Sequence, residues 1–222
     1  MSSRGDTHQA MKQTPRLLTH RDGLLFIAKP AGWTTHRSAE GGPDLVDWLD
    51  KQGKLTRGSR PVHRLDRDTS GVLLCAHPQA RRMASEWFSS GQVHKSYLAL
   101  VYGPMKETGT ISVALDDQQA VTEVVLKGSF VVEDRSVSLV ELSPMTGRKH
   151  QLRRHLHHIR HPVVGDRRYR RRSQSALPGA PDRMWLHAAT LQVPQRPIVE
   201  APLPESLAVH LAQLESSKVK AK

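Results

Sequence analysis

The chain of 222 residues contains a single cysteine, few aromatic side chains and no long apolar run. Cys75 has no second cysteine with which to form a disulfide in the chain, which is typical of a reducing compartment. The longest apolar stretches, such as residues 72–76, are far too short to cross a bilayer. The polar N-terminal segment lacks the apolar core of a secretory signal. These absences argue against a membrane protein and against a disulfide-stapled secreted domain, and they predict a cytoplasmic protein.

Acidic residues are also scarce, because 21 Asp and Glu stand against 33 Lys and Arg, giving a formal net charge of +12. A surplus of that size indicates a polyanionic partner, either nucleic acid or an anionic membrane. The positive charge is concentrated between Arg148 and Arg172. That density favours a phosphate-binding surface over a uniformly basic exterior.

Short runs typical of strands alternate with a few helical patterns along the chain. Strands are predicted at residues 23–28, 72–76, 95–102, 121–132, 137–142 and 185–193. One predicted helix begins at Pro78 and ends at a Gly91 cap, and another begins near Lys149 or His150. Several strands with few helices predict an α+β domain on a mostly antiparallel sheet. Residues 17–214 are assigned to this domain, residues 1–16 to a disordered tail and residues 215–222 to a basic disordered tail.

The segment His63 to Gly71, HRLDRDTSG, alternates two arginines with two aspartates before it enters a predicted strand. Positive charge on both sides of Asp66 would keep its carboxylate ionised, and such a group can act as a nucleophile or a base. For residues 68–70 a tight turn is the favoured interpretation. The Asp-x-Asp loop of haloacid dehalogenase-type phosphatases is disfavoured, because it should follow an apolar parallel strand and residues 60–64 make a poor one.

Residues 146–156, TGRKHQLRRHL, form a turn that runs into a strongly basic helix. Helical spacing places His150, Arg153, Arg154 and His157 on one side, where they could bind phosphates or a carboxylate. Five histidines lie between residues 150 and 161. They lack the His-Glu-x-x-His pattern and have no cysteine or carboxylate ligand close by in the sequence, so no metal site is predicted.

In their order along the chain, these segments resemble one family of RNA-modifying enzymes. HRLDRDTSG, HKSYLALVYG, TGRKHQLRRHL, HPVVGD and WLHA look like the motifs of RluA-type pseudouridine synthases, and the likeness runs from about residue 17 to residue 204. AKPAGWTTHRS and GRKHQLRRHL are similar in particular to family members that act on tRNA. The resemblance implies the pseudouridine synthase fold, a long, mostly antiparallel mixed sheet with flanking helices and a central RNA-binding cleft.

The resemblance also implies an activity and a set of site residues. The expected reaction converts a uridine of a structured RNA to pseudouridine, without metal or organic cofactor, in a monomeric enzyme. A tRNA is the favoured substrate, and 23S ribosomal RNA is the alternative. By resemblance, Asp66 is catalytic, Tyr97 packs on the target uracil and Arg153 pairs with Asp66. Further residues predicted to contact RNA are Arg64, Arg148, Lys149, His150, Arg154, Arg160, Arg167 and Arg168.

Two features keep alternatives open at this point. A non-catalytic RNA-binding module could use the same basic surface, and for such a module Asp66 would be dispensable. The stretch between Gly103 and Thr122 also looks short for the family, whose members use this region near the RNA, so the choice of RNA is not settled by the motifs.

Overall fold

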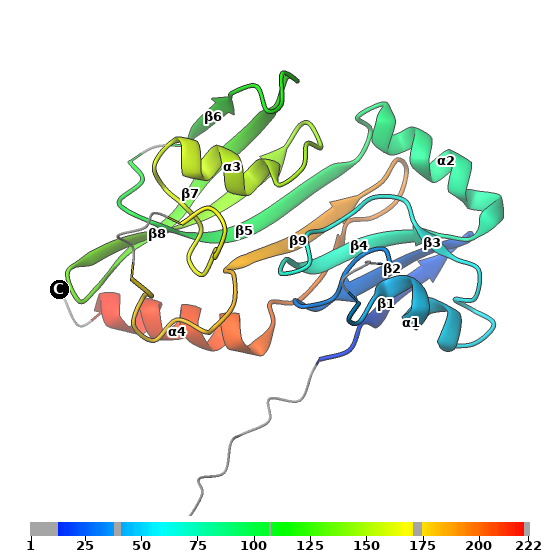
Figure 1. Cartoon of the computed structure of the whole chain (residues 1–222), viewed down its shortest axis with the longest axis horizontal. Helices are drawn as coiled ribbons and strands as arrows, with labels where there is room; N and C mark the ends of the chain where they lie inside the picture. Colours follow the sequence, from blue (N-terminus) through cyan, green and yellow to red (C-terminus); the bar gives the residue numbers. More distant parts are fainter. Residues whose placement is uncertain (1–12, 38–40, 107, 171–174, 220–222) are drawn as a thin grey trace, which may run out of the picture.

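The computed structural model describes residues 13–37, 41–106, 108–170 and 175–219. Within them lies a ten-stranded sheet in which the strands follow the order β1-β2-β4-β9-β5-β8-β7-β6, while β3 pairs with β4 and β10 with β9 (Figure 1). The pair β4–β9 is parallel and the other named pairs are antiparallel. The predicted α+β class and mostly antiparallel sheet are therefore confirmed.

The strands are β1 (Arg16–Arg21), β2 (Leu24–Lys29), β3 (Arg60–Pro61), β4 (Ser70–Ala76), β5 (His94–Tyr102), β6 (Gly109–Ser112), β7 (Val121–Val132), β8 (Arg135–Pro144), β9 (Leu186–Gln192) and β10 (Val199–Glu200). The helices are α1 (Leu45–Lys51), α2 (Pro78–Ser89), α3 (Gln151–His158) and α4 (Glu205–Val219). Each predicted strand and helix corresponds to one of these elements, with bounds that differ by a few residues.

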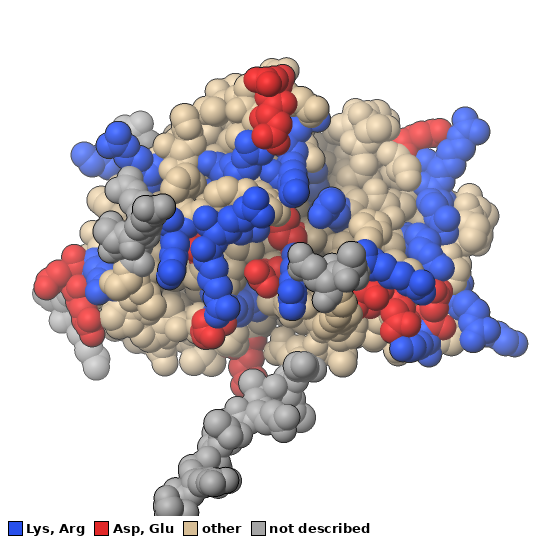
Figure 2. All heavy atoms as spheres, viewed as in Figure 1, with Lys and Arg blue, Asp and Glu red and all other residues tan. Residues whose placement is uncertain are grey.

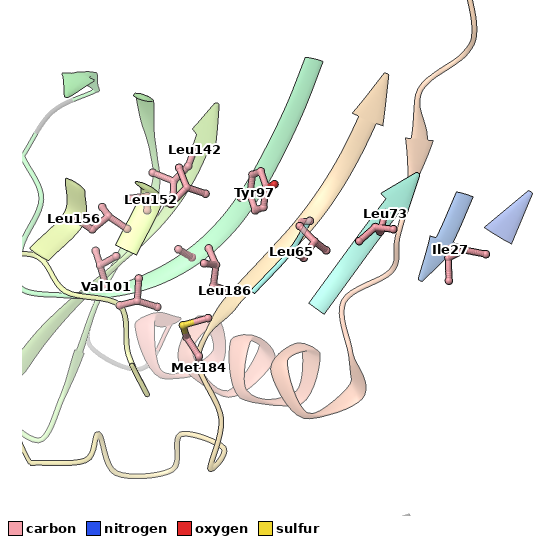
Figure 3. Packing of buried hydrophobic residues seen from close by; sticks show 14 of the residues in the cluster. Ile27, Leu65, Leu73, Tyr97, Val101, Leu142, Leu152, Leu156, Met184 and Leu186 are labelled. Carbon is pink, nitrogen blue, oxygen red and sulfur yellow. The ribbon is translucent and has the colours of Figure 1, made fainter. Parts of the chain in front are cut away.

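Side-chain alternation along the strands divides the core between the two faces of the sheet. On β4, Leu73 and Cys75 join a cluster that includes Leu152 of α3 and leucines of α1. Val72 and Leu74 point the other way and pack with alanines of α2. The first cluster also holds Tyr97 of β5, which Figure 3 shows among these apolar side chains. Helices α1 and α3 thus cover one face, and Asp66, Tyr97 and Arg153 come together on that side.

Helix α4 corrects the predicted C-terminal tail, because it continues through residues 215–219. Leu207 and Leu214 of α4 are buried against the sheet in a cluster with Trp185. Once those turns are packed, the helix extends through a polar sequence at little further cost. At the other end, β1 already begins at Arg16. The tail assignments for residues 1–12 and 220–222 fall outside the described residues.

The loop between β3 and β4 carries Asp66. Hydrogen bonds from buried side chains hold the backbone of this loop in place. Thr35 Oγ1 donates to the Leu65 carbonyl at 2.9 Å and accepts from the Leu65 amide at 3.1 Å. The buried Lys29 ammonium donates to the Arg67 carbonyl at 3.1 Å. Gly71 then enters β4 with φ of +125°, where an added Cβ would lie 2.1 Å from the Ala188 carbonyl oxygen. Glycine is therefore required where this loop meets the sheet.

Candidate active site

Asp66, Tyr97 and Arg153 come from three distant segments and line one cleft of about 1120 Å³. Asp66 projects from the β3–β4 loop, Tyr97 from β5 and Arg153 from α3. The predicted pairing of Arg153 with Asp66 is confirmed, because Nη1 of Arg153 donates to Oδ2 of Asp66 at 2.9 Å. The structure therefore brings together the three residues that the motifs singled out.

Arg153 also binds a second carboxylate, that of Asp166, which follows α3 in the chain. Nε of Arg153 donates to Oδ2 of Asp166 at 2.6 Å, and Nη2 donates to Oδ1 at 2.9 Å. The Asp166 carboxylate is fully buried and accepts the backbone N–H groups of Arg168 and Tyr169 at 2.9 and 3.0 Å. Arg153 is thus clamped by a bidentate ion pair on one side and offers its remaining nitrogen to Asp66 on the other.

The pKa values of the clamped pair shift in the directions expected for buried opposite charges. Burial alone would lower the pKa of Arg153, but its hydrogen bonds to Asp166 and Asp66 raise the pKa above its ordinary value. Burial alone would raise the pKa of Asp166, but Arg153 and two backbone amides hold it below its ordinary value. Both groups are therefore charged at neutral pH.

His150 lines the cleft next to Asp66 and contacts Tyr169. Nε2 of His150 lies 3.7 Å from Oδ1 of Asp66, and Nδ1 of His150 lies 2.9 Å from the Tyr169 hydroxyl. The Tyr169 ring lies under the guanidinium of Arg153, 4.9 Å from ring centroid to Cζ. Burial lowers the pKa of His150, although the negative charge of Asp66 acts in the opposite direction.

Tyr97 lies at the floor of the cleft with 9% of its surface exposed. Burial, and then the charge of Asp66, raise the pKa of its phenol well above the ordinary value, so the hydroxyl is protonated at neutral pH. No hydrogen-bond partner for this hydroxyl occurs in the described part of the chain. A flat ring and an available hydroxyl therefore stand beside Asp66.

The predicted RNA-contact residues fall into two groups. Arg64, Arg148, Lys149 and His150 line the cleft, whereas Arg154, Arg160, Arg167 and Arg168 lie outside its lining. Arg154 makes a bidentate pair with Asp116 at 2.8 and 2.9 Å, and Arg167 pairs with Asp182 at 2.8 Å. Figure 2 shows Lys and Arg side chains gathered over α3 and the segments that adjoin it. Arg171 and Arg172 lie outside the described residues.

The sequence analysis gave no role to Asp166 or Tyr169, although Asp166 ends the HPVVGD motif. Charge balance was the available signal, because a buried arginine needs acceptors for several N–H groups. Asp166 is the first acidic residue after Arg153 in the chain. No comparable signal pointed to Tyr169, whose role depends on the path of the chain after α3.

The histidines near α3 have separate partners. His155 lies 3.0 Å from both Thr122 Oγ1 and the Val113 carbonyl, and His161 lies 2.8 Å from the Tyr102 carbonyl. Among the described residues no group of three or more His, Cys, Asp or Glu side chains is placed to hold a metal ion. In the same residues no helix has the length and apolar character needed to cross a bilayer.

Comparison with known proteins agrees with this geometry. A profile described as RNA pseudouridylate synthase matches residues 23–158. The tRNA pseudouridine synthase C of Haemophilus ducreyi is 38% identical over 213 residues, covering 79% of this chain and 83% of that protein. The ribosomal large subunit pseudouridine synthase D of Xylella fastidiosa is 36% identical, covering 89% of this chain and 69% of that protein. The solved structure of human RNA pseudouridylate synthase domain containing 4 superposes with a TM-score of 0.76 at 27% identity, covering 90% of this chain and 92% of that one.

The fold and the cleft are those of an RNA-modifying isomerase. The chain belongs to the RNA pseudouridylate synthase family, and its activity is the conversion of uridine to pseudouridine in RNA.

The buried pair Arg153–Asp166 and the exposed pair Arg154–Asp116 should differ sharply in their contribution to stability. We expect Asp166→Asn to lower the free energy of unfolding by about 3–5 kcal/mol, because it leaves the buried Arg153 without its clamp. Asp116→Asn, which breaks the exposed pair with Arg154, should change the free energy of unfolding far less, because solvent screens that pair. Urea unfolding of the three proteins at neutral pH measures both.

The pH dependence gives an independent check on the same variant. Because the pKa of Asp166 is lowered in the folded protein, its contribution is present above the unfolded value of about 3.9 and is lost as pH falls through the folded value. The difference in free energy of unfolding between wild type and Asp166→Asn should therefore shrink in acid. A difference that stays constant, or equal effects of the two substitutions, would contradict the clamp.

Proposed function

We propose that Asp66 is the catalytic residue of this synthase and that its substrate is a uridine of tRNA. The observation that carries the proposal is the state of the Asp66 carboxylate. Oδ2 is held by Arg153 at 2.9 Å, while Oδ1 accepts no hydrogen bond from the described residues and lies 3.7 Å from Nε2 of His150. A carboxylate tethered by one oxygen and open at the other is placed to react with a nucleotide in the cleft.

A stacked uridine cannot reach Asp66, so the target nucleotide must leave the RNA helix and enter the cleft. The Tyr97 ring offers a flat apolar surface on which the uracil would stack, and its hydroxyl offers a hydrogen bond to a base edge. Arg64 is exposed and lines the same cleft two residues before Asp66. It is suited to hold the backbone of the flipped nucleotide or to fill the space that the base leaves.

The chemistry requires no reagent beyond the protein. The bond between ribose C1′ and uracil N1 breaks and a bond between C1′ and C5 forms. C5 then loses its proton, and N1 gains one. Atoms and electrons balance within the nucleotide, so one carboxylate and groups that move protons suffice. Asp66 supplies the carboxylate, and its attachment to the Arg153–Asp166 clamp fixes its position before the uridine arrives.

The proposal of tRNA as substrate is supported by the name of the Haemophilus ducreyi relative and by the tRNA-type spelling of residues 147–156. The Xylella fastidiosa relative, named for the ribosomal large subunit, makes ribosomal RNA the second candidate. We also propose that the enzyme acts as a monomer in the cytoplasm. Asp66, Tyr97 and Arg153 all come from this chain, so these three residues of the site need no second copy, and Cys75 is a buried free thiol, as is common in a reducing compartment.

Substitution of Asp66 tests the catalytic assignment and the substrate in one experiment. Wild type and Asp66→Ala are incubated, in the presence of EDTA, with unmodified total tRNA and with ribosomal RNA, and pseudouridines are mapped. We expect a new pseudouridine in tRNA with the wild type and loss of at least about 1000-fold in rate with the variant, because its carboxylate is absent. Binding of RNA should change by less than about threefold, since Asp66 contributes chemistry rather than charge neutralisation. Pseudouridine formation that survives the substitution would overturn the catalytic role of Asp66, and modification of ribosomal RNA alone would overturn the choice of tRNA.

The cleft cations should supply affinity without taking part in chemistry. We expect Arg148→Gln and Lys149→Gln each to weaken RNA binding and to reduce the slope of log K against log salt by about 0.7–0.9, because each removes one phosphate contact. Arg21→Gln, an exposed arginine on the edge strand β1, is the matched control and should leave the slope unchanged. Titration of labelled tRNA at several salt concentrations measures the slope, and equal slopes for all four proteins would contradict the assigned surface.

A further inference from the structure

His150 adopts a backbone conformation that its side chain does not readily tolerate. Its φ is +53°, in the left-handed region, at the residue that precedes α3. For a residue other than glycine this conformation is strained, because Cβ comes too close to the carbonyl oxygen that follows it. Strain of this kind persists where the surrounding structure imposes it, and it is often found at functional sites.

The His150 side chain does not serve the helix that it precedes, since it makes no capping hydrogen bond. Gln151 holds the turn before the helix, because its Oε1 accepts from the Arg148 amide at 3.0 Å and from Thr146 Oγ1 at 2.7 Å. The imidazole of His150 lies instead in the cleft wall between Asp66 and Tyr169. Its placement therefore needs an explanation other than the start of α3.

Tyr169 connects this imidazole to the clamp that holds Asp66. The Tyr169 hydroxyl lies 2.9 Å from Nδ1 of His150, its amide donates to Asp166 and its ring lies under Arg153. A hydroxyl that donates to Nδ1 leaves the proton of a neutral imidazole on Nε2, the nitrogen that faces Oδ1 of Asp66. Tyr169 thus contacts both His150 and Arg153, the two residues that lie next to the oxygens of Asp66.

We infer that His150 is a positioning residue for the reaction, which directs its neutral Nε2–H toward the cleft-facing oxygen of Asp66 and is itself oriented by Tyr169. The inference rests on the proposed function, because it gives Asp66 the catalytic role. At 3.7 Å the contact is too long for a hydrogen bond, so the neutral imidazole orients Oδ1 of Asp66 while leaving it open to the nucleotide.

The charge of His150 then decides whether Asp66 can react. The groups that face the imidazole are Asp66 from the β3–β4 loop, Arg153 from α3, Lys149 beside it in the chain, and Arg168 and Tyr169 from the segment after α3. At neutral pH the imidazole is neutral, so only Oδ2 of Asp66 lies next to a full positive charge, that of Arg153. In acid, protonated His150 places a second positive charge at Oδ1. With both oxygens paired, the carboxylate is held away from the nucleotide and conversion slows.

Two substitutions at His150 separate positioning from folding. His150→Gly removes the imidazole while glycine accepts the φ of +53° without strain. His150→Gln keeps an N–H donor of similar reach that cannot titrate. Tyr169→Phe is a third variant, which keeps the ring under Arg153 and the amide on Asp166 but lacks the hydroxyl.

Single-turnover rates are measured with saturating unmodified tRNA from about pH 5 to pH 8, together with RNA affinity and melting temperature. We expect His150→Gly to slow conversion by about tenfold or more with an unchanged melting temperature and with affinity within about threefold of wild type. His150→Gln should recover most of the rate at neutral pH and should lack the fall in rate that the wild type shows in acid. Tyr169→Phe should slow conversion several-fold because the imidazole loses its orientation.

The inference is overturned if His150→Gly converts tRNA at the wild-type rate, or if His150→Gln shows the same fall in acid as the wild type. Asp66→Asn, measured in parallel, tests the catalytic role of Asp66 separately from the positioning role of His150. An active Asp66→Asn removes the proposed catalytic role itself. An inactive Asp66→Asn beside a fully active His150→Gly leaves that role intact and removes only the role of His150.

Discussion

A single buried guanidinium, that of Arg153, is the interaction on which the arrangement of the site depends. It faces Asp166 with two nitrogens and Asp66 with the third, at distances of 2.6 to 2.9 Å. A buried arginine with one acceptor would be strongly destabilising, and two carboxylates without it would repel each other. Because Arg153 pairs with both carboxylates, the orientation of Asp66 depends on Asp166, which lies outside the lining of the cleft.

The fold serves this interaction by bringing three segments to one face of the sheet. The β3–β4 loop is fastened by Lys29 and Thr35, Tyr97 stands on the central strand β5, and α3 packs its leucines onto the same cluster. Arg153 and Asp66 are 87 residues apart in sequence. Their contact therefore depends on the register of the sheet and on the docking of α3, and the strained backbone at His150 lies where α3 meets the loop.

Much of this could be predicted from the sequence because the signals are local or come from ordered motifs. Alternating apolar residues located the long strands, Pro78 and Gly91 marked the ends of α2, and the motif resemblance placed Asp66, Tyr97 and Arg153 in one site. Asp166 and Tyr169 were missed because their roles come from the path of the chain after α3, which no local pattern records. Helix α4 was not predicted, and residues 215–219 were assigned to a tail because they are polar in sequence, whereas burial of Leu214 shows that the helix packs up to their start.

The measurement that tests the central claim most directly is the single-turnover rate of Arg153→Lys with saturating tRNA. Lysine keeps the positive charge between the two carboxylates, but its ammonium cannot bind Asp166 with two parallel hydrogen bonds while donating to Asp66. If the clamp positions Asp66, conversion should slow on the order of 100-fold, while RNA affinity stays within about threefold of the wild-type value. A folded Arg153→Lys protein that converts uridine at the wild-type rate would contradict the account, because charge alone would then suffice.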